Sequence, residues 1–164
     1  MFRQADITST LQTIPWFLEL KPYQLERLSR VVQFRQVSAC EELFHEGERE
    51  DFLYILMEGQ IAITIKVPTR GFAHIFTAEP LDILGWSSLT PIVRQRTATA
   101  KALMPCRLLA FDGEALRHLC EEDHDIGYII MRRVANVVAS RLLTTRLQLF
   151  DILVEKSKYP TQLE

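Results

Sequence analysis

Residues 85–99, GWSSLTPIVRQRTAT, are the part of the chain best suited to bind an anion. Gly85 can adopt backbone conformations closed to other residues, which allows residues 86–89 to form a single helical turn directly after it. The first N–H groups of such a turn lack partners within the turn and carry a partial positive charge. We therefore expect a phosphate-binding site that uses backbone donors and needs no large basic surface.

Side chains of the same segment add further donors. Ser87, Ser88 and Thr97 contribute hydroxyl groups. Arg96, at the start of the next expected strand, supplies a planar guanidinium that can pair with two phosphate oxygens. Serines after a glycine are also common in ordinary turns, and an arginine in this place can be a solvated strand end. The local pattern alone therefore leaves a binding role and a purely structural role open.

The other reactive residue types give weaker indications of chemistry. The four histidines lack the H-x-H or two-histidine, one-carboxylate spacing of metal enzymes. The three cysteines are odd in number and have no C-x-x-C pairing, which argues against a disulfide framework or a metal cluster. A net charge of -2 gives none of the broad attraction to nucleic acid that a basic protein has.

Strands are expected to position the anion-binding segment. Between residues 31 and 111, short runs rich in Val, Ile, Phe and Tyr recur at intervals of about 8 to 12 residues, a spacing typical of an all-β barrel or sandwich. In residues 60–67, isoleucines alternate with Ala, Thr and Lys, which predicts a half-buried strand. The expected strands are residues 31–37, 52–57, 60–67, 73–78, 81–84, 97–104 and 107–111.

Helices are expected on both sides of this β region. Residues 11–30 have a spacing of apolar residues close to helical, but Pro15 and Pro22 interrupt it, so we expect two or three short helices. After the β region, Asp112 is placed to cap a short helix over residues 113–120. Asp123 is placed to cap a second, long helix that continues to residue 156.

The long C-terminal helix carries two apolar stripes. One, which we call the seam, follows the alternating spacing of three and four residues typical of a coiled coil: Tyr128, Met131, Ala135, Val138, Leu142, Thr145, Leu149 and Ile152. The second stripe, on the adjacent face, is Ile126, Ile130, Val134 and Val137. We expect one stripe to pack on the chain's own barrel and the other on a twin helix, giving a homodimer through residues 125–153. Burial of both stripes in one larger core is the alternative.

Four stretches of the sequence, taken in order, resemble the bacterial catabolite-activator type of cyclic-nucleotide-binding domain over residues 14–150. They are IPWFLELKPYQLERL, LFHEGEREDFLYILMEGQIAI, the segment from Gly85 to RTATA, and DHDIGYIIMRRVANVVASRLL. The resemblance implies a mainly β fold with flanking helices: a double-stranded β-helix, or jelly-roll, barrel with short N-terminal helices and a long C-terminal dimerisation helix.

A chain of 164 residues is expected to form a single domain. We divide the sensor domain, residues 1–156, into N-terminal helices (1–30), a β-barrel (31–112) that contains the phosphate-binding segment (85–99), and C-terminal helices (113–156). Residues 157–164 are expected to form a tail.

The resemblance also implies roles for individual residues. Gly85 and the turn after it, with Ser87 and Ser88, would bind the cyclic phosphate through N–H and hydroxyl groups, while Arg96 and Thr97 would hydrogen-bond its oxygens. Thr145 falls near the place where family members read the base from the dimer helix. A nucleotide bonded to Thr145 would report its presence to the partner subunit, although a threonine tolerated in the seam explains the residue equally well.

Trp86 departs from the family pattern. Members typically carry a glutamate here, which accepts a hydrogen bond from the ribose hydroxyl, whereas the indole can only donate. A lost charged hydrogen bond is worth roughly 1.5 to 3 kcal/mol, or about ten- to over a hundredfold in affinity. Trp86 can stack on a ring of the ligand or fill the sugar side of the pocket. Loss of cyclic-nucleotide affinity is the further alternative.

The resulting hypothesis is a regulatory domain, not an enzyme, that binds a cyclic nucleotide, cyclic AMP by family preference, or a related anion, and signals through a dimer helix. No cofactor beyond this regulatory ligand is expected. No apolar run approaches the roughly 18 residues of a membrane span, so we expect a cytoplasmic protein. Only eight residues follow Lys156, so a DNA-binding domain is not expected within this chain. The sensor part of a transcription regulator and a stand-alone regulatory module both fit.

Two other functions stay open as alternatives. One is a degenerate sensor that binds no cyclic nucleotide and acts as a dimeric interaction module. The other is an enzyme or haem sensor on a similar barrel, of which a metal-dependent cupin is the main example. A cupin needs clustered metal ligands, which the scattered His45, His74, His118 and His124 do not provide, and a haem sensor needs an axial ligand, for which His74 is the only modest candidate.

Overall fold

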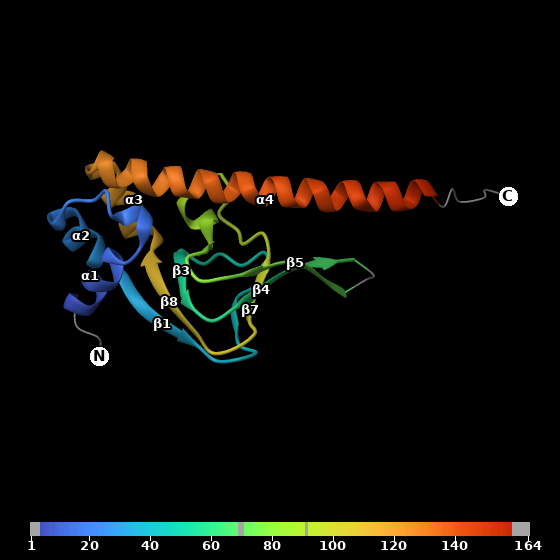
Figure 1. Cartoon of the computed structure of the whole chain (residues 1–164), viewed down its shortest axis with the longest axis horizontal. Coiled ribbons are helices and arrows are strands. Elements are labelled where there is room, and N and C mark those ends of the chain that lie inside the picture. The colour runs from blue at the N-terminus through green and yellow to red at the C-terminus, as the bar shows by residue number, and fades with distance from the viewer. Residues whose placement is uncertain (1–3, 69–70, 91, 159–164) are drawn as a thin grey trace.

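The computed structural model describes residues 4–68, 71–90 and 92–158 (Figure 1). Its helical elements are α1 (Gln4–Gln12), η1 (Pro15–Phe17), α2 (Pro22–Ser29), η2 (Trp86–Leu89), α3 (Gly113–Glu122) and α4 (His124–Lys158). Its strands are β1 (Val32–Val37), β2 (Glu42–Phe44), β3 (Phe52–Glu58), β4 (Ile61–Val67), β5 (Gly71–Ala78), β6 (Ile83–Leu84), β7 (Thr99–Ala102) and β8 (Cys106–Asp112). Residues 1–3, Pro91 and residues 159–164, within the expected N-terminal helices, phosphate-binding segment and tail, lie outside the described residues.

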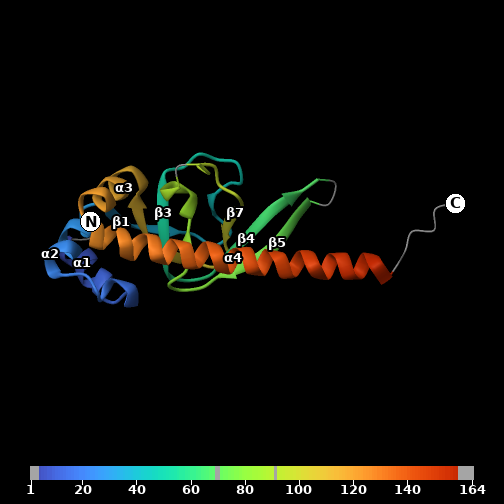
Figure 2. The ribbon, with the colours of Figure 1, turned by 90° about the horizontal axis from the view of Figure 1, so that it is seen from above.

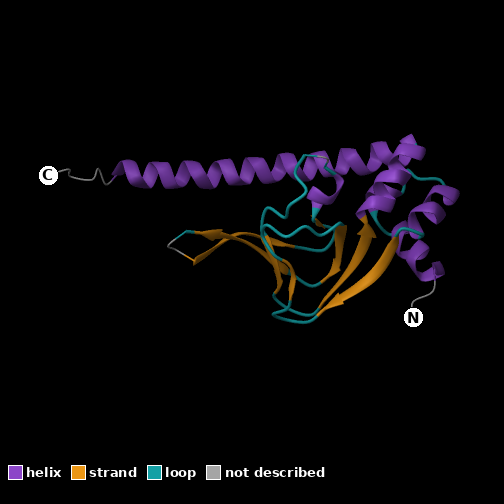
Figure 3. Ribbon diagram, turned by 180° about the vertical axis from the view of Figure 1, so that it is seen from behind, coloured by secondary structure: helices purple, strands orange, loops and turns teal. Residues whose placement is uncertain are grey.

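Two antiparallel sheets form the β part of the fold. Their strand orders are β1-β8-β3-β6 and β2-β7-β4-β5. This arrangement, with helices at one end and along one side (Figure 3), confirms the predicted jelly roll with flanking helices. The expectation of a barrel was wrong in one respect. Within the described residues, no strand of one sheet pairs with a strand of the other, so side-chain packing, not a continuous hydrogen-bond ladder, joins the two sheets.

The alternation of side chains along β3 explains why the sheet β1-β8-β3-β6 is packed on both sides. Leu53 and Ile55 point to the helices and join the core formed with α1, α2, α3 and α4. Tyr54 and Leu56 point the other way, into the core between the two sheets. Successive residues of a strand face opposite sides of its sheet. A run of four buried apolar residues therefore places β3 at the centre of the molecule.

The long helix α4 begins among α1, α2 and α3 and runs along the sheets to a point beyond them (Figures 1 and 2). The capping residues predicted for α3 and α4 are both present. The Asp112 carboxylate accepts a hydrogen bond from Ala115 N at 2.8 Å at the start of α3, and the Asp123 carboxylate accepts one from Ile126 N at 3.3 Å at the start of α4. No helix among the described residues is long and apolar enough to cross a membrane.

The structure decides between the two stripes of α4. The second stripe, from Ile126 to Val137, is buried in the chain's own core. In the seam, by contrast, Tyr128, Met131, Leu142, Leu149 and Ile152 are all exposed. The alternative in which one core buries both stripes is therefore wrong for the single chain, and the seam is a free apolar surface along most of the helix.

Most expected strands shift by one or two residues at an end, and three differences are larger. β2 was not predicted, because three residues give too short a pattern. The strand expected over residues 97–104 shrinks to β7, so that Arg96 and Thr97 lie in the loop before it. The strand expected over 81–84 shrinks to β6, since Leu81 has a φ of 75° and forms part of a turn.

Candidate functional site

The predicted helical turn is present and begins at Gly85. This glycine has a φ of 71°, in the left-handed region that glycine adopts most readily, and η2 follows it directly. A Cβ atom placed on Gly85 would overlap the Arg96 guanidinium and lie 2.7 Å from the Phe52 carbonyl oxygen. Both the backbone conformation and the lack of space therefore require glycine here.

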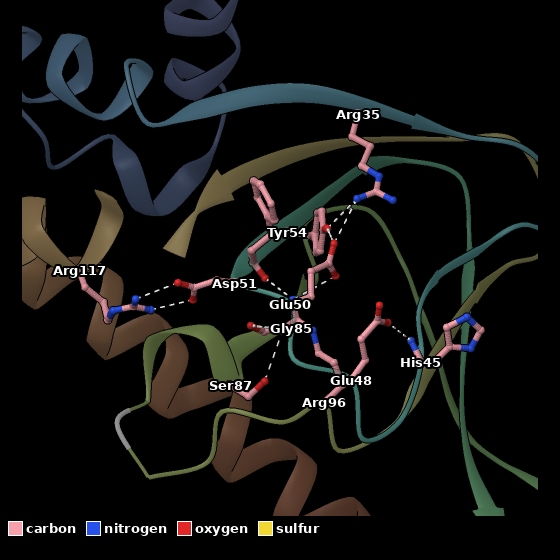
Figure 4. A network of polar contacts seen from close by, with 11 residues as sticks. Arg35, His45, Glu48, Glu50, Asp51, Tyr54, Gly85, Ser87, Arg96 and Arg117 are labelled. Atoms are coloured by element: carbon pink, nitrogen blue, oxygen red, sulfur yellow. Dashed lines mark hydrogen bonds and ion pairs between the residues drawn. The ribbon is translucent and has the colours of Figure 1, made fainter. Parts of the chain in front are cut away.

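Arg96 folds inward onto this turn. Its side chain is 1% exposed. Nη1 donates to the Gly85 carbonyl at 2.8 Å and Nη2 donates to the Phe52 carbonyl at 2.6 Å (Figure 4). The guanidinium carbon lies 4.5 Å from the centre of the Phe44 ring. The structure thus brings the arginine and the glycine turn together, as the sequence predicted, and leaves no solvated strand end.

Glu50 connects Arg96 to a small network of polar side chains (Figure 4). Its carboxylate accepts hydrogen bonds from Arg96 Nη2 at 3.3 Å, Arg35 Nη1 at 3.3 Å and the Tyr54 hydroxyl at 2.5 Å. Burial of Tyr54 and, as the second cause, its hydrogen bond to Glu50 raise the pKa of this tyrosine well above its ordinary value, so its hydroxyl remains a hydrogen-bond donor. Two guanidinium groups share one carboxylate, which leaves this network with a net positive charge.

A cavity of about 360 Å³ lies between this turn, the β4–β5 hairpin and α4. Six of the seven predicted site residues line it: Gly85, Trp86, Ser87, Arg96, Thr97 and Thr145. Ser88 does not line this cavity. It is buried, and its hydroxyl has no partner among the described residues. The rest of the lining is mainly apolar, with isoleucines of β4 and β5 and the rings of Phe44 and Phe76.

Helix α4 forms one wall of the cavity. Val138, Leu142 and Thr145 contribute to this wall and are also members of the seam. Thr144, next to Thr145, is turned back onto its own helix, where its hydroxyl donates to the Ser140 carbonyl at 3.1 Å. The cavity and the candidate dimer surface therefore share residues, so a group bound in the cavity would touch the helix that a partner subunit would contact.

Arg141 is a cavity residue that the sequence reasoning missed. Its guanidinium carbon lies 3.2 Å from the centre of the Phe76 ring, and Nη2 lies 3.6 Å from Oδ1 of Asp82. Burial lowers the pKa of this arginine below its ordinary value. A further contact, from Gln148 Nε2 to the Ile75 carbonyl at 3.0 Å, also ties α4 to β5. Arg141 lies outside both apolar stripes, so periodicity gave no signal for it.

A second ion pair fastens the turn to the helices. Arg117 of α3 donates from both terminal nitrogens to the Asp51 carboxylate, at 2.8 Å each (Figure 4). Its Nη1 also donates to the Ser88 carbonyl. The hydrogen bond from Arg117 holds the pKa of Asp51 below its ordinary value. Arg117 thus links the start of β3, η2 and α3.

In the described part of the chain, no three His, Cys, Asp or Glu side chains gather as a metal site would require.

The depressed pKa of Asp51 makes a small part of the stability dependent on pH. The unfolded carboxyl titrates near pH 4 and the folded one below that, so the pair stabilises the fold fully above about pH 5 and is lost as the pH falls through the folded pKa. Because Asp51 is about half exposed, solvent screening limits the effect to about 1 kcal/mol or less. In urea unfolding between pH 7 and pH 2, the stability cost of Asp51→Asn should be largest at pH 7 and should shrink as the pH falls through the folded pKa. A cost that stays the same at every pH would contradict the contribution of the ion pair.

Gly85→Ala should be far more harmful than the same change at Gly47. Both glycines have a positive φ, 71° and 83°, but a Cβ on Gly47 meets nothing within 4 Å. The left-handed conformation costs alanine roughly 1 to 2 kcal/mol at either position. At Gly85, displacement of the Arg96 guanidinium adds about 1 to 3 kcal/mol. Chemical unfolding of the two variants measures the difference, and equal losses would contradict the close approach of Arg96 to the turn.

Comparison with known proteins shows relatives of this chain that share its sequence pattern. The family described as the cyclic nucleotide-binding domain matches residues 34–123, more than half of the chain. A CRP-like cAMP-activated global transcriptional regulator of Mycobacterium tuberculosis is 26% identical over 137 residues, which are 84% of this chain and 59% of the regulator. A putative potassium channel protein of Rhodopseudomonas palustris is 26% identical over 140 residues, 81% of this chain and 31% of the channel protein.

Solved structures agree with the sequence matches. A putative cyclic nucleotide-binding protein from Geobacter metallireducens superimposes with a TM-score of 0.71 at 25% identity, covering 82% of this chain and 97% of that protein. The chain therefore corresponds to nearly the whole of one solved protein. It spans about a third of the channel protein and about three fifths of the regulator named above.

Proposed function

The chain belongs to the cyclic nucleotide-binding domain family, and on this premise we propose that it is a sensor domain that takes up cyclic AMP in the cavity under α4 and signals through a dimer of that helix. The nucleotide acts as a regulatory ligand, and the domain catalyses no reaction. Its relatives include a cAMP-activated transcription regulator and a channel protein. Both the sensor part of a transcription regulator and a stand-alone regulatory module remain within this proposal.

The anion end of the cavity supports binding of a cyclic phosphate. Gly85, Ser87 and Arg96 come together there, and Arg35 and Arg96 outnumber the single carboxylate of Glu50. Arg96 Nε is buried and has no hydrogen-bond partner among the described residues. Buried donors are rarely left unpaired in native proteins. The first N–H groups of η2 and the guanidinium would together surround a small anion.

The signalling proposal rests on one observation: residues of α4 both line the cavity and belong to the seam. Val138, Leu142 and Thr145 face the cavity and belong to the seam at once. A ligand shifts an equilibrium only as far as its contacts differ between two states. Contacts between the nucleotide and these three residues would change the position of the seam, and with it the affinity for a second copy.

Two measurements test the proposal. Calorimetry with cyclic AMP and cyclic GMP should show saturable binding of one molecule per chain, with cyclic AMP the tighter. Sedimentation velocity should show a dimer whose dissociation constant changes when cyclic AMP is added. Tighter binding of cyclic GMP would overturn the ligand assignment, and a dimer constant unaffected by bound nucleotide would overturn signalling through α4.

The inward position of Arg96 also favours a second candidate function, a dimeric interaction module without cyclic-nucleotide affinity. Its guanidinium already has Glu50, two backbone carbonyls and the Phe44 ring as partners. An anion must therefore compete with, or rearrange, these contacts. A stable dimer that gives no heat with either nucleotide at millimolar concentration would establish this second function in place of the first.

A further inference from the structure

We infer that the cavity recognises the phosphate and the flat base of a 3′,5′-cyclic nucleotide but not its 2′-hydroxyl, so that its ligand class includes ribo- and 2′-deoxy-nucleotides alike. The inference rests on the proposed binding of a cyclic nucleotide and states which part of it the protein reads. It follows from the kinds of polar group that the cavity offers next to the anion end.

The 2′-hydroxyl of a bound cyclic nucleotide must lie close to that end. In a 3′,5′-cyclic nucleotide, the phosphate bridges O3′ and O5′ of the ribose, so its ring shares the C3′–C4′ bond with the sugar, and C2′ is bonded directly to C3′. With the phosphate at Gly85 and Arg96, the hydroxyl on C2′ therefore falls within a few bond lengths of the same turn. The groups that could read it are those that line the cavity beside η2.

Among the described residues that line the cavity there is no carboxylate and no side-chain amide. Both charged groups in the lining, Arg96 and Arg141, are donors without acceptor capacity. Beside the turn, Ile83, Leu84 and the half-buried indole of Trp86 form the wall. A sugar hydroxyl placed against this wall meets carbon, or a donor, rather than a charged acceptor.

Glu50, the carboxylate that contacts Arg96, is not available for this task. It does not line the cavity, and its oxygens already accept from Arg35, Tyr54 and Arg96. Asp82, near Arg141, is likewise outside the lining. The neutral side-chain acceptors in the described lining are the hydroxyls of Ser87 and Thr97, beside the turn, and of Thr145, on the α4 wall. Ser87 is buried, and its hydroxyl oxygen lies 3.4 Å from Arg96 Nη1, from which it accepts a weak bond.

Flat and apolar surfaces make up the remainder of the site. The Arg141 guanidinium lies over the Phe76 ring, and the isoleucines of β4 and β5 continue this wall. Such surfaces stack on a base of either sugar series equally well, because the stacking face of a base does not depend on C2′. Charge at the anion end of the cavity and stacking at the other end therefore both contribute to its affinity for the nucleotide.

The test compares cyclic AMP with 2′-deoxy cyclic AMP on the unmodified chain by titration calorimetry. A neutral hydroxyl contact is worth at most about tenfold in affinity, and a charged one more than that. We expect the two dissociation constants to differ by less than about tenfold. A preference of tenfold or more for the ribonucleotide overturns the inference while leaving the proposed function intact. Binding of neither nucleotide overturns both.

A gain-of-function variant gives a second measurement. Trp86→Glu places a carboxylate in the wall directly after Gly85, where it can accept from a sugar hydroxyl. Its preference for cyclic AMP over the deoxy analogue should rise above about tenfold, with Trp86→Leu as the matched control that keeps the parent's lack of preference. Because the readout is a ratio of two ligands on one folded protein, a general loss of stability in either variant does not imitate the effect. An unchanged ratio in Trp86→Glu would contradict the placement of the sugar beside η2.

Discussion

Arg96→Ala should weaken the binding of cyclic AMP by about a hundredfold or more. Removing one partner of a buried, hydrogen-bonded ion pair typically costs about 2 to 5 kcal/mol, and Arg96 is the only fully buried cation at the anion end of the cavity among the described residues. The same change takes one of two guanidinium partners from Glu50 and removes the hydrogen bonds of Arg96 to the Gly85 and Phe52 carbonyls. A loss of stability is therefore expected beside the loss of affinity.

Two comparisons separate these effects. Arg94→Ala removes an exposed arginine two residues away and should change neither affinity nor stability by more than a small factor. Arg96→Ala combined with Glu50→Gln removes the carboxylate left with one partner fewer, so it should recover part of the stability but none of the affinity. Titration calorimetry and urea unfolding of the three proteins give both quantities. A folded Arg96→Ala protein that binds cyclic AMP as tightly as the parent would show that the phosphate lies elsewhere.

Leu149→Lys should raise the dissociation constant of the dimer by about a hundredfold or more. Leu149 is exposed in the single chain and lies toward the C-terminal end of the seam, beyond the cavity. In a parallel two-helix seam it faces its own copy, so the change removes two buried leucines, each worth about 1.5 to 3 kcal/mol, and brings two lysines together. Because the residue does not line the cavity, the affinity of each chain for the nucleotide should fall only as far as dimerisation contributes to it.

Sedimentation velocity over a range of concentrations measures this constant. Asp151→Lys puts the same charged group within one turn of the helix, outside the seam, and should leave the dimer nearly unchanged. A monomeric parent protein at every concentration would overturn the dimer, and equal effects of the two lysines would show that subunits meet on another face.

The Arg96 and Leu149 variants test the two steps of the proposed signalling, binding of the ligand and contact between the subunits. Arg96 and the glycine turn hold the charge of the ligand, while Val138, Leu142 and Thr145 connect the cavity to the seam. If both variants behave as expected, comparison of the dimer constant with and without nucleotide gives the coupling free energy between the two sites, which must be the same in either direction.

Much of the architecture follows from local patterns in the sequence. The single helical turn after Gly85 and the caps at Asp112 and Asp123 appear where the sequence predicts them, since each depends on a few adjacent residues. The stripes of α4 are equally local, because a helix repeats every 3.6 residues whatever surrounds it. Patterns of this kind could not predict β2, which owes its existence to pairing with β7.

The sequence alone therefore determined which faces of the strands and helices are apolar, where the turn at Gly85 must lie, and which residues are chemically able to hold an anion. Only the tertiary structure decided that the stripe from Ile126 to Val137 is buried while the seam is free, and that Arg96 shares Glu50 with Arg35. It also turned Ser88 away from the cavity and brought Arg141 into it. The reason is physical: each of these contacts joins residues far apart in the chain, and their distances are set by the packing of two sheets and a helix, which local periodicity does not encode.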